Sequence, residues 1–193
     1  MQSSNNLFPV FLKLESLRLL IVGGGYAGME KLEAVLSNSP ATVITLVATQ
    51  ISDAIKERAK AYPNITLIEK PYDNNDLTDK DIVIAAIDDI AVSKQIVEEA
   101  KSKKLLVNAA DKPELCDFYL SSVVKKGNLK IAISTNGKSP TIAKRVKEVL
   151  HETLPDEIDE LLTNMQNIRN KMTGDFTEKV KQLNELTKKL SQK

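Results

Sequence analysis

Short, almost continuous apolar runs alternate with amphipathic stretches along the first 110 residues of the chain. The apolar runs are rich in Val, Ile and Leu, which is typical of strands buried on both faces. They lie at residues 19–22, 42–47, 65–68, 81–86 and 105–108. Between them, apolar residues recur at helical spacing at 27–36, 53–62 and 91–100. This alternation predicts an α/β fold with a doubly wound parallel sheet covered by helices on both faces.

The pattern changes after residue 111. Two β-type runs at 118–124 and 129–134 flank a short Gly-containing turn and predict a β-hairpin. Ser139 and Pro140 then stand where an N-cap and a first helical residue are favoured. The helices beyond carry apolar stripes, which need a surface to cover them. That surface is either a second copy of the chain, which would make this region a dimerisation module, or the chain's own sheet.

The first predicted strand runs directly into three consecutive glycines. Gly23, Gly25 and Gly28 have the spacing G-x-G-x-x-G that opens the helix of a dinucleotide-binding Rossmann fold. In that motif the first glycine permits a tight turn, the second lets the backbone approach a pyrophosphate, and the third lets the helix pack on the strand. The helix N-terminus then offers N–H groups to the phosphates. A glycine turn that serves packing alone is the other interpretation.

The cofactor contacts are expected at the carboxyl ends of the strands, where ligands of such folds bind. The predicted cofactor-binding residues are Gly23, Gly24, Gly25, Tyr26, Ala27, Val47, Ala48, Thr49, Ala86, Ile87 and Asp88. The end of the second strand carries neither the acid that usually contacts the NAD ribose nor an arginine for a 2′-phosphate. The sequence therefore does not identify the ribose contact, although Thr49 or backbone groups could serve.

Acidic residues follow two of the predicted strands. Asp88 and Asp89 come after the fourth strand, where N-capping of the next helix is a sufficient reason for them. Asp111 comes after the fifth strand, in a loop that Pro113 biases away from helix. A carboxylate at that edge could act as a general acid or base. The alternative is that Asp111 caps a helix that begins near Glu114.

A polar, Gly-containing segment precedes the helix that opens at Pro140; it consists of Ser134, Thr135, Asn136, Gly137, Lys138 and Ser139. Its backbone N–H groups could bind the carboxylates of an anionic substrate, with Lys138 adding positive charge. A plain loop between a strand and a helix explains the same residues.

The composition narrows the class of protein. The 193 residues carry a formal net charge of +1 without a basic stripe interleaved with aromatics, so we expect no nucleic-acid partner. Cys116 is the only cysteine, so an internal disulfide is impossible and a reducing compartment is expected. The N-terminus shows no signal-peptide pattern and no apolar run reaches the roughly 20 residues of a membrane span, which predicts a cytoplasmic protein without a membrane partner. The His, Cys, Asp and Glu residues show no metal-ligand spacing, so no metal site is predicted.

Taken together, these motifs resemble the precorrin-2 dehydrogenases, the N-terminal region of siroheme synthase. The similarity in order and spacing spans residues 7 to about 150, and the residues beyond are similar only as helices. The similarity rests on Lys31 and on residues 7–12, 22–25 (the triple glycine), 85–89, 107–111 and 134–140. The chain departs from the family's pattern at Gly28, Glu30 and Ile87, where alanine, arginine and threonine are usual. It carries no methyltransferase extension, so we expect another protein to supply the precursor.

The resemblance implies a reaction. Members of the family transfer a hydride from precorrin-2 to NAD⁺ and release a proton, giving sirohydrochlorin, and some then insert ferrous iron to give siroheme. By resemblance, the cofactor is NAD and Asp111 is the catalytic acid–base residue. The substrate carboxylates would be held by Asn108, Lys112, Ser134, Thr135, Asn136, Gly137, Lys138 and Ser139. The family is a homodimer that exchanges its hairpin and helices, with the cleft between subunits.

The expected organisation is therefore an NAD-binding Rossmann-like domain at 1–112, a dimerisation module at 113–150 and a C-terminal helical region at 151–193. Whether iron, cobalt or no metal is inserted stays open. Two other classes of function also stay open. A regulatory NAD-binding dimer domain without catalysis would give Asp111 no role. An oxidoreductase for another small substrate would need a substrate domain, for which residues 113–193 look too small and too helical.

Overall fold

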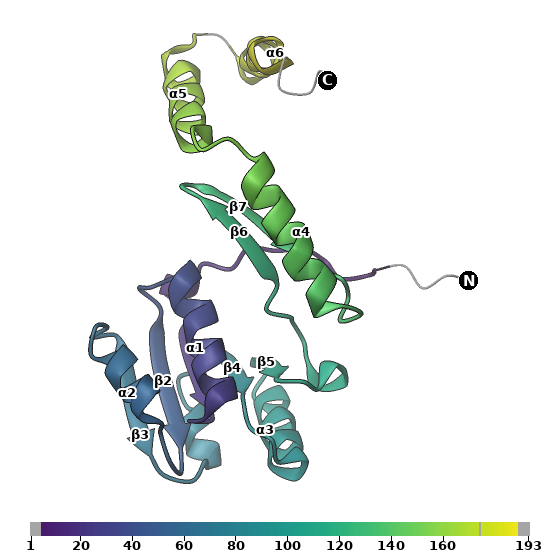
Figure 1. Cartoon of the computed structure of the whole chain (residues 1–193). Helices are drawn as coiled ribbons and strands as arrows, with labels where there is room; N and C mark the ends of the chain where they lie inside the picture. The colour runs from purple at the N-terminus through teal and green to yellow at the C-terminus, as the bar shows by residue number, and fades with distance from the viewer. Residues whose placement is uncertain (1–4, 174, 189–193) are drawn as a thin grey trace. The chain divides into compact units, whose positions relative to one another are not determined.

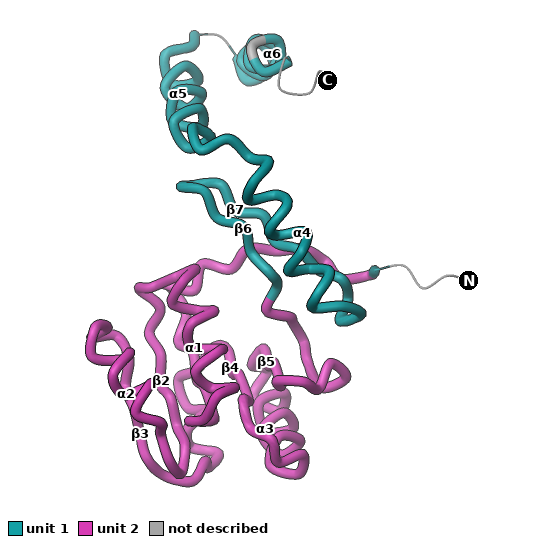
Figure 2. The backbone as a smooth tube through the Cα atoms, in the orientation of Figure 1, with its two compact units in different colours: residues 1–5, 121–193 teal, residues 6–120 magenta. Residues whose placement is uncertain are grey.

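The computed structural model describes residues 5–173 and 175–188, so the outermost parts of the predicted domains, 1–4 and 189–193, lie outside the described residues. The chain forms two compact units, one of residues 6–120 and the other of residue 5 together with the described residues from 121 onwards (Figures 1 and 2). The domain limits expected at residues 112 and 150 stay predictions. None of the helices in the described ranges is long and apolar enough to cross a membrane.

The larger unit is built on a five-stranded parallel sheet with the order β3-β2-β1-β4-β5 (Figure 1). Its strands are β1 (Arg18–Val22), β2 (Val43–Ala48), β3 (Ile65–Glu69), β4 (Ile82–Ala85) and β5 (Leu106–Ala109). All four neighbouring pairs are parallel. The predicted doubly wound parallel sheet is confirmed, and each strand lies within one or two residues of the apolar run that predicts it.

Helices cover both faces of this sheet because its strands are apolar on both sides. Leu19 and Ile21 of β1 face a core shared with α1 (Tyr26–Asn38) and α2 (Asp53–Ala59). Leu20 and Val22 face a second core shared with α3 (Ile90–Ser102) and the 3-10 turn η2 (Asn74–Leu77). Two further 3-10 turns flank the sheet, η1 (Leu14–Ser16) before β1 and η3 (Pro113–Leu115) after β5.

The strand order determines where a ligand can bind. β2 and β3 are added on one side of β1, whereas β4 and β5 are added on the other. The winding therefore reverses at β1, and the loop after β1 lies at the switch point of the sheet. Because the strands are parallel, the loops that follow all five of them emerge at the same edge.

Among its described residues, the smaller unit contains the predicted hairpin and three helices. β6 (Ser122–Lys126) pairs antiparallel with β7 (Leu129–Ile133), and the helices are α4 (Pro140–Thr153), α5 (Ile158–Lys171) and α6 (Phe176–Thr187). The predicted cap of α4 is confirmed, because the Ser139 Oγ accepts a hydrogen bond of 3.2 Å from the Ile142 N–H and Pro140 is the first helical residue. Gly127, at φ +55°, occupies the turn of the hairpin.

The first hairpin strand begins later than the sequence predicts. The pattern predicts it from residue 118, but β6 begins at Ser122. Phe118 instead packs against the core of the larger unit, and its carbonyl accepts a hydrogen bond of 2.9 Å from the Asn108 amide. The apolar run is thus divided between two units, which periodicity alone does not reveal.

Candidate functional site

The loop after β1 packs so closely on its neighbours that side chains are excluded. Gly23 has φ +131°, and a Cβ placed there would lie 2.1 Å from the Ala86 carbonyl oxygen after β4. A Cβ at Gly24 would lie 2.1 Å from the Gln50 carbonyl oxygen after β2. The Gly23 N–H donates to the Val47 carbonyl over 2.9 Å. These contacts bring the ends of β1, β2 and β4 together.

Gly25 differs from the other glycines of the motif. It is the N-cap residue of α1, and no side chain of the described residues caps that helix. A Cβ at Gly25 would meet no other atom within 4 Å in the part of the chain that the structure describes, whereas one at Gly28 would lie 2.1 Å from the Gly23 carbonyl oxygen. The backbone is therefore open at Gly25 and tightly packed at Gly28, which suits a phosphate group seated at the N-terminus of α1.

A pocket of about 540 Å³ opens above this loop. All the predicted cofactor-binding residues except Val47 line it, and so does Asp111. The Val47 side chain is fully buried in the core beside α3, so this residue reaches the loop only through its carbonyl. The volume lies within the range of about 300–1,000 Å³ that is usual for small-molecule sites.

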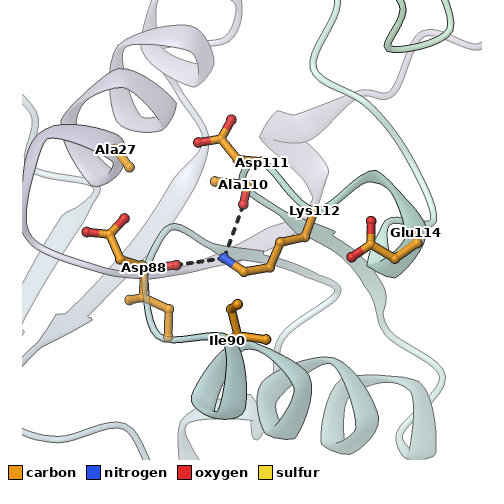
Figure 3. A pocket seen from close by; sticks show the side chains of 8 residues that line it. Ala27, Asp88, Ile90, Ala110, Asp111, Lys112 and Glu114 are labelled. Atoms are coloured by element: carbon orange, nitrogen blue, oxygen red, sulfur yellow. Dashed lines mark hydrogen bonds between the residues drawn. The ribbon is translucent and has the colours of Figure 1, made fainter.

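A second pocket, of about 380 Å³, lies at the ends of β4 and β5 (Figure 3). It shares Ala27, Ile87, Asp88 and Asp111 with the larger one. The two pockets are therefore adjoining parts of one site, and the start of α1 lines both of them.

Asp111 enters this site directly after β5, with its backbone in the left-handed region at φ +58°. Its carboxylate is exposed and points away from the amine of Lys112 (Figure 3). The helix expected near Glu114 is only the short turn η3, whose N-cap is Lys112, and no described side chain caps it. Capping therefore does not explain Asp111.

Lys112 ties two strand ends together. Its Nζ donates to the carbonyl oxygens of Ile87, over 3.1 Å, and Ala110, over 3.4 Å (Figure 3). The side chain predicted to anchor substrate thus also joins the loop after β4 to the loop after β5.

Asp88 and Asp89, adjacent in sequence, have different environments. Asp89 caps α3, because its Oδ1 accepts from the N–H groups of Ala91 (2.8 Å) and Val92 (3.1 Å). Asp88 is exposed and lines both pockets. The capping interpretation therefore holds for Asp89, and Asp88 is available to a ligand.

Asn108 lies beneath the site instead of lining either pocket. Only 6% of it is exposed, and its amide donates to the Phe118 carbonyl and to the Cys116 sulfur. The same sulfur receives the Ala109 N–H over 3.2 Å, and burial raises the pKa of the Cys116 thiol. These contacts hold the chain that follows Asp111.

The polar loop at 134–139 belongs to the smaller unit. Asn136 and Gly137 have φ values of +53° and +73°. The Thr135 hydroxyl donates to the Ser139 carbonyl over 3.1 Å and accepts from the Ser139 N–H over 3.2 Å, while the Ser134 hydroxyl accepts from the Asn136 N–H. Lys138 is exposed. Internal hydrogen bonds thus shape this loop, with Lys138 directed to solvent.

Sequence reasoning missed four residues that line the larger pocket: Val22, Gln50, Tyr72 and Val92. A usable signal existed for Tyr72, since it follows β3 at the same edge of the sheet as the other strand-end loops. The rule that ligands bind at carboxyl ends applies to β3 as much as to β1, β4 and β5.

Glu69, the last residue of β3, holds the β2 side of the site. Its Oε1 accepts from the Ile51 N–H over 2.9 Å, directly after pocket residues Thr49 and Gln50, and pairs with the Lys56 ammonium at 3.0 Å. The hydrogen bond from Ile51 and then the bond from Lys56 lower the pKa of the Glu69 carboxyl. Glu69 therefore does not take the place of the ribose-binding acid that β2 lacks. Instead it orients the loop that follows β2.

A doubly wound sheet with a glycine loop at its switch point and an open helix N-terminus above that loop defines a dinucleotide-binding Rossmann-like domain. Residues 10–122 match the family described as "Putative NAD(P)-binding", and the chain belongs to this family. Residues 126–151 match the family described as "Sirohaem biosynthesis protein central".

Relatives with similar sequences are siroheme synthases. That of Psychrobacter sp. is 36% identical over 176 residues, covering 91% of this chain and 34% of the relative. That of Psychrobacter cryohalolentis is 35% identical, covering 91% and 32%. The chain thus spans about a third of the length of these relatives. A solved structure of SirC, precorrin-2 dehydrogenase, has 25% identity and a TM-score of 0.74, covering 96% of this chain and 93% of that one.

We expect Gly25→Val to abolish tight NAD⁺ binding without unfolding the protein. The side chain would enter open space, so the melting temperature should stay near that of the wild type, but it would block a pyrophosphate from the backbone. Calorimetric titration should show affinity reduced by more than about tenfold. Gly23→Ala is the matched contrast: its Cβ meets Ala86, so it should lower stability by about 3 kcal/mol. Unchanged NAD⁺ affinity in Gly25→Val would contradict the phosphate-loop assignment.

We also expect a pH-dependent contribution of Glu69 to stability. Its folded-state pKa lies below the ordinary value of 4.5, so its contribution is present above that pH and is lost as the pH falls through the lower, folded value. Denaturant titrations at pH 7 should find Glu69→Gln less stable than the wild type, with the difference shrinking below pH 4.5. Glu98→Gln, on the exposed face of α3, is the control and should show neither effect. A Glu69→Gln difference that is independent of pH would contradict this role.

Proposed function

We propose that this chain catalyses the NAD⁺-dependent dehydrogenation of precorrin-2 to sirohydrochlorin. The observation that carries the proposal is the place of Asp111, which lines both the glycine-loop pocket and the pocket beside it and has no capping role among the described residues. The siroheme synthase relatives and the similarity to SirC, precorrin-2 dehydrogenase, support the choice of substrate. The single cysteine, Cys116, fits work in a reducing cytoplasm.

The residues of the larger pocket fit NAD⁺. Gly25 leaves room for a pyrophosphate against the backbone, and the N-terminus of α1 supplies N–H groups and a partial positive charge. When bound, NAD⁺ supplies the hydride acceptor. The ends of β2 and β4 would hold its two nucleoside halves, and Lys112 would keep the loop after β4 in place through the Ile87 carbonyl.

Asp111 takes the proton in this scheme. Dehydrogenation removes a hydride and a proton from the tetrapyrrole, and the hydride goes to the cofactor. The Asp111 carboxylate accepts the proton and passes it to solvent, to which it is exposed. The left-handed backbone at Asp111 places this side chain beyond the strand end, within the pocket that also contains Asp88.

The carboxylates of the substrate need positively charged groups and N–H donors. Lys112 in the larger unit and Lys138 in the polar loop at 134–139 are the proposed anchors, together with the backbone donors of that loop. Asn108 would act from below, by fixing the chain that carries Asp111.

We further propose that the protein is a homodimer. One face of α4 packs on the hairpin, while Ile142, Val146 and Val149, at helical spacing, are 55%, 39% and 59% exposed. An apolar stripe of this kind needs a partner surface. The exchange of hairpin and helices between two copies would cover it.

Replacing Asp111 tests the proposed reaction. Asp111→Asn is the suitable variant, because asparagine tolerates the left-handed backbone that alanine would strain. NAD⁺ affinity should stay within about twofold, whereas the rate of sirohydrochlorin formation from precorrin-2, followed anaerobically by visible absorption, should fall about 10²- to 10⁴-fold. Turnover at the wild-type rate would remove Asp111 from the mechanism. Full NAD⁺ binding without any wild-type turnover would favour a regulatory NAD-binding dimer. Ferrous iron added afterwards tests for siroheme formation as a further step.

Replacing Val149 tests the dimer. We expect Val149→Glu to convert a dimer into a monomer, because it puts a charge into the apolar stripe of α4. Light scattering coupled to gel filtration measures the mass directly. Lys147→Glu, an exposed position on the same helix, is the matched control and should stay dimeric. A monomeric wild type would contradict the proposal.

A further inference from the structure

Tyr72 lies in the larger pocket in an arrangement that the proposed chemistry does not use. It follows β3 and lines the pocket with Thr49 and Gln50. Its hydroxyl donates over 2.7 Å to the Glu99 Oε2 on α3, and the Glu99 Oε1 accepts from the Gln95 amide over 2.9 Å. Burial and then the Glu99 carboxylate raise the pKa of Tyr72 well above its usual value, so the phenol stays a hydrogen-bond donor at every working pH.

This hydrogen bond decides which part of Tyr72 a ligand meets. Since Glu99 holds the hydroxyl, the aromatic ring is what the residue offers to the pocket. The ring also packs with the core beside α3, which limits its rotation. An anchored aromatic ring gives up little conformational freedom when a flat group stacks on it.

The topology indicates which half of the cofactor reaches Tyr72. The glycine loop follows β1, with β2 and β3 on one side and β4 and β5 on the other (Figure 1). A dinucleotide with its pyrophosphate at Gly25 therefore extends one nucleoside towards each side. Asp111 follows β5, so the nicotinamide that receives the hydride belongs on that side. The adenosine then extends over the ends of β2 and β3.

We propose that Tyr72 is a cofactor-binding residue that stacks its ring on the adenine of the cofactor, with Glu99 as the positioning residue that fixes the ring. This rests on the proposed use of NAD⁺. Stacking fits the lack of an acid or arginine for the ribose at the end of β2, because affinity on this side must come from other contacts. Because the stacking contact is made by the adenine alone, an adenine nucleotide without nicotinamide should also bind here.

Binding of cofactor fragments to the full chain tests the proposal. ADP-ribose carries the adenine half and nicotinamide mononucleotide the other half. By calorimetry, Tyr72→Ala should weaken binding of ADP-ribose and NAD⁺ by roughly 5- to 150-fold while leaving the mononucleotide unchanged. Tyr72→Phe keeps the ring but loses the hydrogen bond to Glu99, so its ADP-ribose affinity should lie between those of the wild type and Tyr72→Ala. Tyr62→Ala removes a half-buried tyrosine before β3, outside the pocket, and should not change ADP-ribose affinity.

A second variant tests the site without removing the aromatic ring, as Tyr72→Ala does. The chain has no tryptophan, so Tyr72→Trp introduces a single fluorescent indole at the site. Its emission should change on titration with ADP-ribose and stay constant with the mononucleotide. This readout decides the matter if Tyr72→Ala proves unfolded by circular dichroism.

The outcomes separate this proposal from the function on which it rests. ADP-ribose affinity unchanged in folded Tyr72→Ala, or a loss confined to the mononucleotide, overturns the adenine assignment while wild-type dehydrogenation still supports the enzyme. A wild type that binds neither NAD⁺ nor ADP-ribose overturns both. Selective loss of ADP-ribose binding in Tyr72→Ala, with an intermediate affinity in Tyr72→Phe, supports the stacking role, whereas Tyr72→Phe at the wild-type affinity overturns the positioning role of Glu99.

Discussion

The site depends on backbone packed against backbone without side chains between. Gly23 lies against the Ala86 carbonyl, Gly24 against the Gln50 carbonyl and Gly28 against the Gly23 carbonyl. At such distances only glycine fits, so the ends of β1, β2 and β4 and the start of α1 are held together. The apolar sheet supplies the force that keeps them there, since β1 is buried between two cores. One steric constraint thus assembles the glycine loop and its neighbours.

Around that centre, polar side chains divide between fixing loops and facing the pocket. Asp89 accepts a hydrogen bond from the N-terminus of α3, and Glu69 accepts one from the Ile51 N–H. Asn108 donates one to the Phe118 carbonyl. Each satisfies a backbone group in a loop, or at a helix start, that follows a strand of the sheet. Lys112 does the same for two carbonyls while remaining at the pocket edge. With the loops held in this way, the smaller pocket presents the carboxylates of Asp88, Asp111 and Glu114.

The strands and helices of the larger unit were predictable because they depend on local burial. A strand covered on both faces must be apolar throughout, so β1 and β4 stand out in the sequence. The start of the hairpin was not predictable, because it depends on a distant contact: the Asn108 amide of β5 donates a hydrogen bond to the Phe118 carbonyl. The glycine motif and Asp111 were predictable as candidates, since each follows a strand end. Tyr72 was missed although it too follows a strand end; its hydrogen bond to Glu99, 27 residues away, is what the sequence could not show.

The roles of Asp88 and Asp89 show why sequence reasoning reaches candidates but not assignments. Both are acids after the same strand, and either could cap α3. The structure gives the cap to Asp89, whose Oδ1 lies 2.8 Å from the Ala91 nitrogen. A single-residue shift in where α3 begins would exchange the two roles. The same holds for Asp111: had η3 begun one residue earlier, Asp111 would have stood at its N-cap. Because Lys112 holds that position, the Asp111 carboxylate is left to face the pocket.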